Sequence, residues 1–367
     1  MNWKGRRVLL TGHTGFKGSW LALWLQGLGV ELCGLALEPP TADNLFEDAR
    51  VGQGMRSVIG DIRDAELVRR VFIEHRPEVV FHLAAQPLVR ASYADPLGTY
   101  ATNVMGTAHV LEAARAIDTL RAVVVVTTDK CYENREWPWP YRESDRLGGF
   151  DPYSNSKACA ELVVSAYRNS FFNPGDYARH GVAIASARAG NVIGGGDWAE
   201  DRLVPDAIRA FQQGRPVQIR SPKAVRPWQH VLEPLRGYLD LAALLLGNLD
   251  QLDKGVAGAG AWNFGPHPGD AKPVEWVVNE LARLWGQGAG WEQEQGAHPY
   301  EAQTLMLDIS KAAAQLGWQP RMQVAEALAI TTAWYGERWQ RERGGSVDMR
   351  AFTEAQIRDY EMLMFRF

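Results

Sequence analysis

Cysteine is scarce in this chain, and no hydrophobic run approaches the length of a membrane span. The three cysteines, Cys33, Cys131 and Cys159, lack the CxxC spacing of a redox motif or a zinc site. Such sparse cysteine is typical of a protein from a reducing compartment. The longest apolar runs, AVVVV and LAALLL, fall far short of the roughly 20 residues that a transmembrane helix needs. We therefore expect a soluble, cytoplasmic protein with no membrane partner.

A basic surface and a metal-ligand pattern are missing too. The 39 Lys and Arg against 43 Asp and Glu leave a net charge of -4, which provides no electrostatic reason to expect a nucleic-acid partner. The eight histidines show no ligand spacing, so we expect no metal site. What remains is an ordinary globular composition, with 46% hydrophobic and 22% charged residues.

Apolar, β-branched runs alternate with helical patterns through the first half of the chain. Continuous runs such as RVLLT, EVVFHLA and AVVVVTT predict strands that are buried on both faces. Between the first runs, Trp20 and Trp24 fall on one face of a helix. This alternation predicts an α/β fold, a doubly wound parallel sheet of Rossmann type. We expect a dinucleotide-binding domain over 1–190 to which some later segments return, a smaller C-terminal substrate lobe over 191–340, and a peripheral tail over 341–367.

Gly12, Gly15 and Gly18 form a G-x-x-G-x-x-G turn between a predicted strand and a predicted helix. Glycine permits a close approach of the backbone, and the N-terminus of the following helix favours a pyrophosphate. A tight structural turn is the alternative, but strand, turn and helix in this order are the context of a dinucleotide site. Glu38 ends the next predicted strand, where a carboxylate bonds ribose hydroxyls and repels a 2′-phosphate. NAD is therefore favoured over NADP, unless Glu38 is merely an exposed loop residue.

Tyr153 and Lys157 lie four residues apart and share one face of a predicted helix. An ammonium beside a phenol lowers the pKa of the phenol, which could then take a proton from a substrate hydroxyl. Thr128, at the carboxyl end of the run AVVVVTT, is placed to donate a hydrogen bond to the reacting oxygen.

Asp129 and Lys130 follow Thr128 directly. Loss of water needs an acid that protonates a leaving hydroxyl and a base that removes the proton alpha to a transient ketone. Asp129 and Lys130 have the chemistry for these two roles. A solvated pair at the end of a strand is the alternative.

These motifs resemble the extended branch of the short-chain dehydrogenase/reductase superfamily, and within it the nucleotide-sugar 4,6-dehydratases. Most of those enzymes carry Thr-Asp-Glu where this chain has Thr-Asp-Lys. That departure, together with TGHTGFKGSW, GNVIGGGDWAEDRLVPD and RPWQHVLEPL, resembles the branch that acts on CDP-glucose. The resemblance covers about residues 3–335. It implies a lyase that uses NAD to make CDP-4-keto-6-deoxyglucose for deoxysugar and lipopolysaccharide O-antigen biosynthesis, and a homodimer that pairs helices over 96–116 and 153–172.

The resemblance also implies roles for single residues. Tyr153 would deprotonate the glucose 4-hydroxyl, Lys130 would remove the C5 proton, and Asp129 would protonate the departing 6-hydroxyl. The implied NAD-binding residues are Gly12, Thr14, Gly15, Phe16, Gly18, Glu38, Asp61, Ile62, Leu83, Ala84, Ala85, Thr102, Tyr153 and Lys157. The implied substrate-binding residues are Gln86, Arg90, Ser92, Asn191, Val192, Arg202, Arg226 and Tyr300. Trp198 and Trp228 are candidates to flank the cytosine, with ordinary packing as the alternative.

Three rival functions stay open on the sequence alone. A sugar-nucleotide 4-epimerase on the same fold loses no water and would not need the Asp-Lys pair. A non-enzymatic dinucleotide sensor would keep the glycines and lose the Tyr and Lys. A dehydratase of another nucleotide-hexose, such as a dTDP- or GDP-sugar, would carry the same motifs, because patterning does not read the base.

Overall fold

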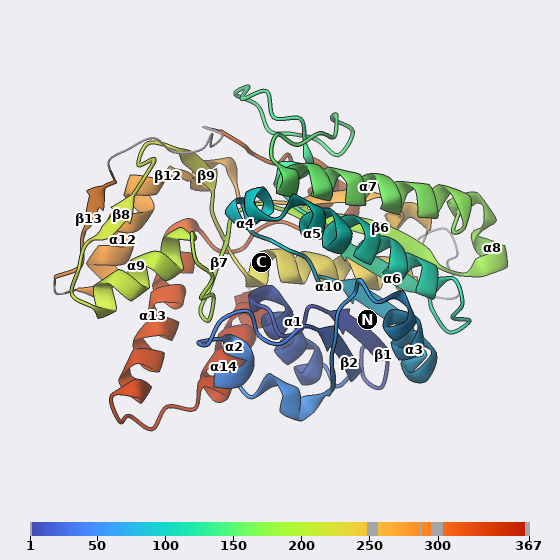
Figure 1. The fold of residues 1–367 in the computed structure, drawn as a ribbon, viewed down its shortest axis with the longest axis horizontal. Coiled ribbons are helices and arrows are strands. Elements are labelled where there is room, and N and C mark those ends of the chain that lie inside the picture. The colour runs from blue at the N-terminus through green and yellow to red at the C-terminus, as the bar shows by residue number, and fades with distance from the viewer. Residues whose placement is uncertain (1, 248–255, 287, 295–303, 364–367) are drawn as a thin grey trace.

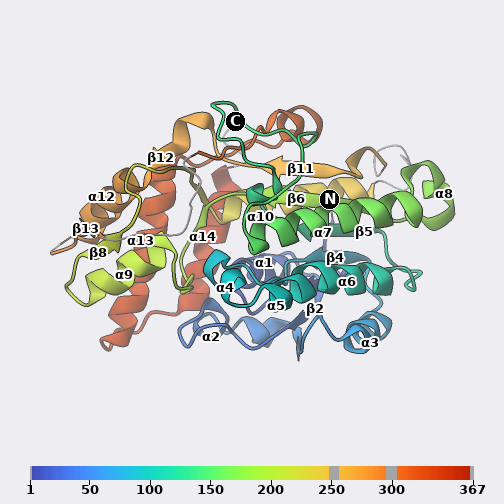
Figure 2. The same cartoon turned by 45° about the horizontal axis from the view of Figure 1, so that its top comes forward.

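The computed structural model describes residues 2–247, 256–286, 288–294 and 304–363. A sheet of seven parallel strands lies at its centre, in the order β11-β6-β5-β4-β1-β2-β3. The strands are β1 (Arg7–Thr11), β2 (Glu31–Ala36), β3 (Arg56–Ile59), β4 (Val79–His82), β5 (Ala122–Val126), β6 (Ala183–Ala189) and β11 (Ala261–Phe264). Helices cover both faces of this sheet (Figure 1 and Figure 2). The predicted doubly wound α/β fold is thus confirmed.

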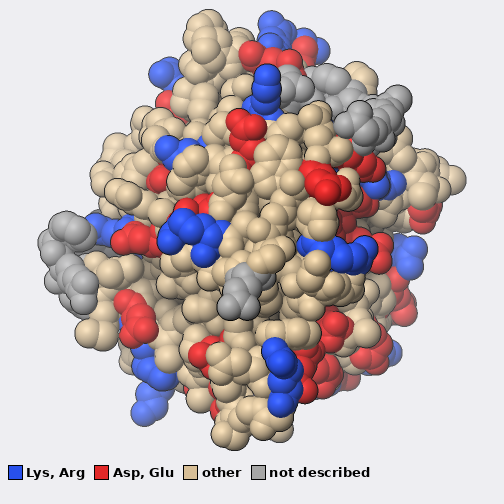
Figure 3. Space-filling view, turned by 90° about the vertical axis from the view of Figure 1, so that its left-hand side faces the viewer, with Lys and Arg blue, Asp and Glu red and all other residues tan. Residues whose placement is uncertain are grey.

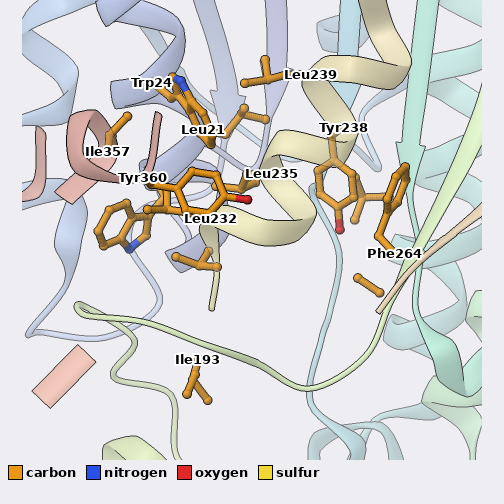
Figure 4. Close-up of a cluster of buried hydrophobic side chains, with 14 of the residues drawn as sticks. Leu21, Trp24, Ile193, Leu232, Leu235, Tyr238, Leu239, Phe264, Ile357 and Tyr360 are labelled. Atoms are coloured by element: carbon orange, nitrogen blue, oxygen red, sulfur yellow. The ribbon is translucent and has the colours of Figure 1, made fainter. Parts of the chain in front are cut away.

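The two faces of the sheet bury different sets of side chains, because successive residues of a strand point to opposite sides. On one face, Val8 and Leu10 of β1 pack in a core with α1 (Phe16–Gly27), α10 (Leu232–Leu246) and α14 (Met349–Leu363). Figure 4 shows the side chains that these three helices contribute.

On the other face, Leu9 packs with residues of α3 (Ala65–His75), α6 (Gly106–Ala114) and α7 (Pro152–Ser170). The inner strands β1, β4 and β5 are therefore buried on both sides, whereas β3, at the edge of the sheet, is largely exposed.

The C-terminal tail, which we expected to be peripheral, packs into the core through helix α14. Its side chains Met349, Ile357 and Tyr360 are buried in the same core as β1 and α1. The Tyr360 hydroxyl also donates to a carboxylate oxygen of Glu233, at 2.7 Å. The polar composition of the tail hid a buried stripe, since a helix needs only one apolar face to join a core.

A smaller lobe of short elements lies beside the sheet, at the left of Figure 1. It contains α9 (Leu203–Gln212), β8 (Val217–Ile219), β9 (Val225–Pro227), β12 (Ala271–Pro273), α12 (Val274–Trp285), β13 (Trp291–Gln293) and α13 (Val324–Glu342). Strand β8 pairs with β13, and β9 pairs with β12. The chain crosses between lobe and sheet more than once, because β11 adds the seventh strand to the sheet after α9 and β8 have formed in the lobe.

Acidic and basic side chains are interspersed on the face of the molecule that Figure 3 shows. This agrees with the small net charge of -4. Across the described ranges, no helix has the length and hydropathy that crossing a membrane requires.

Candidate active site

A cavity of about 1040 Å³ opens where the carboxyl ends of the sheet strands meet the smaller lobe. Its size slightly exceeds the range of roughly 300–1,000 Å³ that is usual for ligand sites. Residues from the sheet side, such as Gly12 and Asp129, face residues from the lobe, such as Arg202 and Arg226, across it. Ligands bind at this edge in open α/β sheets, so the cavity is the candidate active site.

The glycine turn is packed so tightly that side chains cannot enter it. Gly12 has φ +81°, and a Cβ there would lie 2.7 Å from the backbone nitrogen of Ala84. A Cβ on Gly18 would overlap the carbonyl oxygen of Gly12. Gly15 caps the N-terminus of α1, whose first turn has no acidic residue. The turn therefore fits a pyrophosphate at a helix N-terminus, which is the feature that NAD needs.

The structure brings every residue of the expected NAD set to the wall of this cavity. Two of them need comment. Glu38 does not end β2, which stops at Ala36, but lies exposed in the loop that follows, at the rim of the cavity. Asp61 is engaged by Arg63, whose backbone nitrogen and Nε both donate to its carboxylate at 2.8 Å. These hydrogen bonds lower the pKa of Asp61 and keep it ionised.

Thr128 and Asp129 are joined by a hydrogen bond at the end of β5. The Thr128 hydroxyl donates to Oδ1 of Asp129 at 2.9 Å. We had expected it to donate to the reacting oxygen of the substrate. Asp129 is only 3% exposed, and burial raises the pKa of its carboxyl against the charge of Lys130 and the hydrogen bond from Thr128. A carboxyl whose pKa is raised retains a proton to a higher pH, as a general acid must. Its Oδ2 atom has no hydrogen-bond partner among the described residues.

Tyr153 and Lys157 lie in the first two turns of α7, as the sequence predicts. The N-cap Asp151 accepts from the backbone nitrogen of Ser154 at 2.9 Å and holds the start of this helix. Burial raises the pKa of Tyr153 to about 12, and a side-chain hydrogen bond with Thr128 partly offsets that rise.

The expectation that Lys157 lowers the pKa of Tyr153 is not met in this structure. Lys157 donates from Nζ to the carbonyl oxygen of Val126 at 3.3 Å, and burial lowers its own pKa to about 8. For both buried side chains, the effect of desolvation on the pKa is larger than the effect of the charge that their spacing led us to expect.

Most of the expected substrate residues also line the cavity. They are Arg90, Asn191, Val192, Arg202 and Arg226. Tyr300 lies outside the described residues. Trp198 and Trp228 border the cavity but are 4% and 5% exposed, and the ring of Trp198 packs edge-on to Tyr335, so packing accounts for most of their surface.

Gln86 and Ser92 correct the expected substrate set, because neither lines the cavity. Nε2 of Gln86 donates to Oγ1 of Thr99 at 2.9 Å, and its Oε1 accepts from the backbone nitrogen of Leu88. Oγ of Ser92 accepts from the backbone nitrogen of Tyr153 at 3.1 Å. Both side chains are occupied by internal hydrogen bonds, and Ser92 supports the turn that carries Tyr153.

The sequence reasoning missed several charged residues of the site, among them Lys17, Asp197, Asp201 and Arg220. Lys17 in the first turn of α1 lines the cavity, and burial lowers its pKa to about 8. Asp197 accepts from Nη1 of Arg202 at 2.8 Å, and Asp201 forms an ion pair of 2.8 Å with Nη1 of Arg90. A lysine in the first turn of a helix is unfavourable because its charge opposes the helix dipole. This unusual position was the signal that could have revealed Lys17.

Arginines border the cavity beside carboxylates: Arg202 forms an ion pair with Asp197, and Arg90 and Arg220 both pair with Asp201. Arg202, Arg220 and Arg226 line it from the lobe, and Arg90 lines it from the short helix α4 (Val89–Ala94). Forked guanidinium groups are well suited to a diphosphate. The site thus has a dinucleotide cradle on one side and arginines with their carboxylate partners on the other, and Asp129 and Tyr153 also line it.

Comparisons with known proteins agree with this geometry. The model of the NAD dependent epimerase/dehydratase family matches residues 8–253. The CDP-glucose 4,6-dehydratase of Salmonella typhimurium (strain LT2) is 53% identical over 358 residues, which cover 98% of this chain and 97% of that protein. In the same comparison, a dTDP-glucose 4,6-dehydratase of Xanthomonas campestris (strain B100) is 27% identical, over 89% of this chain and 92% of that protein.

A solved structure shares the fold at lower identity. It is the dTDP-glucose 4,6-dehydratase of Bacillus anthracis in complex with NAD. Its TM-score is 0.72 at 23% identity, and the match covers 91% of this chain and 98% of that chain.

Proposed function

The chain belongs to the NAD dependent epimerase/dehydratase family, and on this premise we propose that it is a nucleotide-sugar 4,6-dehydratase that converts CDP-glucose to CDP-4-keto-6-deoxyglucose. The observation that carries the proposal is the buried Asp129, whose pKa is raised. Asp129 and Tyr153 both form a hydrogen bond with the hydroxyl of Thr128. An epimerase moves no hydroxyl off the sugar and needs no such acid. The relative that is 53% identical supports the choice of CDP-glucose.

NAD is the cofactor of this family, and the cradle fits it. We assign the pyrophosphate to Gly12, Gly15 and Gly18, the adenosine to the surface of Glu38, Asp61 and Ile62, and the remainder of the NAD to the other residues of the expected set. When bound, NAD accepts a hydride from the sugar and later returns it, and the positive charge of its oxidised form favours a nearby phenolate.

Tyr153 is the residue that takes the proton of the sugar 4-hydroxyl. It acts as a base only when ionised, and its pKa of about 12 shows that burial opposes this. Thr128 and the charge of Arg202 act in the opposite direction and lower that pKa. Tyr153 also lies at a helix start that Asp151 and Ser92 fix, so the phenol is held in one place.

Asp129 and Lys130 carry out the loss of water. Asp129 protonates the departing 6-hydroxyl, and its raised pKa keeps the proton on the carboxyl until then. Lys130 removes the proton at C5, a step for which its amine must first have lost its own proton. The two residues are adjacent in the 3-10 turn η3 (Asp129–Cys131), and both line the cavity, which supports their acting on one sugar.

The nucleotide-sugar lies mainly against the lobe of residues 191–340 in this proposal. Arg202, Arg220 and Arg226 hold its diphosphate, and Asn191 and Val192 meet the sugar. The deciding experiment is to incubate the protein and NAD with CDP-, dTDP-, UDP- and GDP-glucose in parallel and to detect 4-keto-6-deoxy product. We expect turnover of CDP-glucose. Formation of a 4-epimer, or preference for another nucleotide, would overturn the assignment.

A homodimer is proposed as the assembly. Leu97, Met105 and Leu162 are large apolar side chains that are 81%, 51% and 58% exposed, on or next to α5 (Pro96–Tyr100), α6 and α7. Pairing these helices with those of a second copy would bury them. A monomeric mass by light scattering at micromolar concentration would contradict this.

The cytoplasm is the proposed location, since Cys33, Cys131 and Cys159 are unpaired thiols in the structure. The proposed product suits deoxysugar biosynthesis, with the O-antigen of lipopolysaccharide as its destination. Loss of deoxysugar from the O-antigen after disruption of the gene is the corresponding test.

A further inference from the structure

One hydroxyl group connects the two residues that exchange protons with the sugar. The Thr128 hydroxyl donates to Oδ1 of Asp129 at 2.9 Å and also forms a side-chain hydrogen bond with Tyr153. All three residues are buried, with exposed fractions of 7%, 3% and 8% for Thr128, Asp129 and Tyr153. A phenol, a hydroxyl and a carboxyl thus form a continuous chain at the end of β5.

The proposed reaction leaves these two residues in the wrong protonation states after each turnover. Tyr153 gains the proton of the 4-hydroxyl, which becomes a ketone. Asp129 loses its proton to the 6-hydroxyl, which leaves as water. The base at C5 takes one proton and gives one back, so it ends unchanged. A second turnover therefore requires that one proton pass from Tyr153 to Asp129.

We propose that Thr128 is the relay that returns this proton. The O–H bond of Tyr153 breaks as an O–H bond forms to Oγ1 of Thr128. The original O–H bond of Thr128 breaks as one forms to Oδ1 of Asp129. One proton is transferred in total, no electrons leave or enter, and Thr128 is restored once its hydroxyl rotates. This proposal rests on the proposed dehydratase function, because only loss of water deprotonates Asp129.

The orientation of the Thr128 hydroxyl suits a transfer in this direction. It already donates to Asp129, so its lone pairs are available to accept from elsewhere. The backbone nitrogen of Lys130 donates to one of them, at 3.3 Å. The side chain of Tyr153 is the other group in hydrogen-bonding contact. Thr128 is itself held as the N-cap of η3, so the relay keeps its geometry.

The test replaces Thr128 with Val, which has nearly the same shape and no hydroxyl, and with Ser, which keeps the hydroxyl. Product formation is followed in a single turnover with enzyme in excess and then in steady state. We expect Thr128→Val to complete a first turnover, more slowly than Thr128→Ser because it lacks the hydroxyl that lowers the pKa of Tyr153. Its steady-state kcat should fall by about 10²-fold relative to that first turnover, since each later cycle waits for a proton.

A small proton donor provides a second readout that a merely structural role would not move. Added imidazole at constant pH and ionic strength should raise kcat of Thr128→Val and leave wild type and Thr128→Ser unchanged. If Thr128→Val fails to fold, Thr128→Ala takes its place in both measurements.

Two results would overturn the relay. The first is a Val variant that loses the first turnover and kcat in equal proportion, including complete loss of both. The second is a Val variant whose kcat equals its single-turnover rate and does not change when imidazole is added. Failure of the proposed function looks different, because wild type itself would then form no 4-keto-6-deoxy product from any of the four nucleotide-glucoses.

Discussion

Glu161 and Arg188 form an ion pair of 2.8 Å, from Oε2 to Nη2, in which both side chains are only 3% exposed. Glu161 lies one helical turn beyond Lys157 on α7, and Arg188 lies on β6. Glu161 also accepts from the hydroxyls of Thr127 and Ser186. This pair therefore fixes the helix that carries Tyr153 and Lys157 to strand β6 of the sheet.

We expect Glu161→Gln to reduce the free energy of unfolding by about 3–5 kcal/mol, because it leaves the Arg188 guanidinium buried without its counter-charge. Urea denaturation measures the change. Glu112→Gln is the matched control, since the Glu112–Arg115 pair is 55% and 40% exposed and should be worth less than about 1 kcal/mol. Equal losses in the two variants would show that the buried pair has no special role.

Tyr153→Phe should lower kcat by about 10²–10⁴-fold, because it removes the group that takes the 4-hydroxyl proton. NAD binding, followed by equilibrium dialysis, should persist since the glycine cradle is untouched. Tyr167→Phe is the control: its hydroxyl lies further along the same helix and donates to Glu112 at 3.2 Å. Near-normal turnover in a folded Tyr153→Phe would remove Tyr153 from its role.

Asp129→Asn should still oxidise the sugar at C4 but release little 6-deoxy product, since hydroxide is a poor leaving group without an acid. The near-ultraviolet absorbance of the reduced cofactor should therefore rise and persist after CDP-glucose is added. Full dehydration by this variant would show that another group is the acid.

Lys130→Ala should also stall after oxidation, and in addition it should stop exchange of the C5 proton with deuterated water. Mass spectrometry of recovered sugar measures that exchange. Asp129→Asn serves as the comparison, because its C5 base remains and exchange can continue. Normal exchange in Lys130→Ala would move the base to a different residue.

His82 should make the protein sensitive to acid. Burial lowers the pKa of His82 to about 3 from the usual 6.5, and Lys157 adds to this. Between those pH values the unfolded chain binds a proton that the folded chain excludes, so stability that is present above pH 6.5 is lost as the pH falls.

The hydrogen bonds of His82 explain why the folded ring stays neutral. Its Nδ1 lies 2.7 Å from Oγ1 of Thr11, which already accepts from the backbone nitrogens of Leu83 and Ala84. Thr11 must therefore donate to Nδ1, and a proton there would break that bond. We expect His82→Gln to make the loss of unfolding free energy shallower by about 1.4 kcal/mol per pH unit below pH 6. Identical slopes in urea titrations of the two proteins would contradict this.

Much of the site was predictable because its signals are local. The glycine turn, the run that ends at Thr128, and the spacing of Tyr153 and Lys157 each lie within a few residues, where backbone sterics and helix periodicity decide the outcome. The order of strands and helices likewise follows from alternating patterns. These signals were enough to predict the parallel sheet and to place Thr128, Tyr153 and Lys157 at its carboxyl edge.

Tertiary structure alone decided where individual side chains point and how far water is excluded from them. Gln86 and Ser92 follow the same strand as cavity residues, yet internal hydrogen bonds turn them away from the cavity. Lys157 donates to the carbonyl oxygen of Val126. The pKa of Tyr153 is raised because the effect of burial exceeds the effect expected from the charge of Lys157. Desolvation and hydrogen-bond partners depend on segments far apart in the chain, so the sequence determined which residues meet at the site, and the fold determined what each one does there.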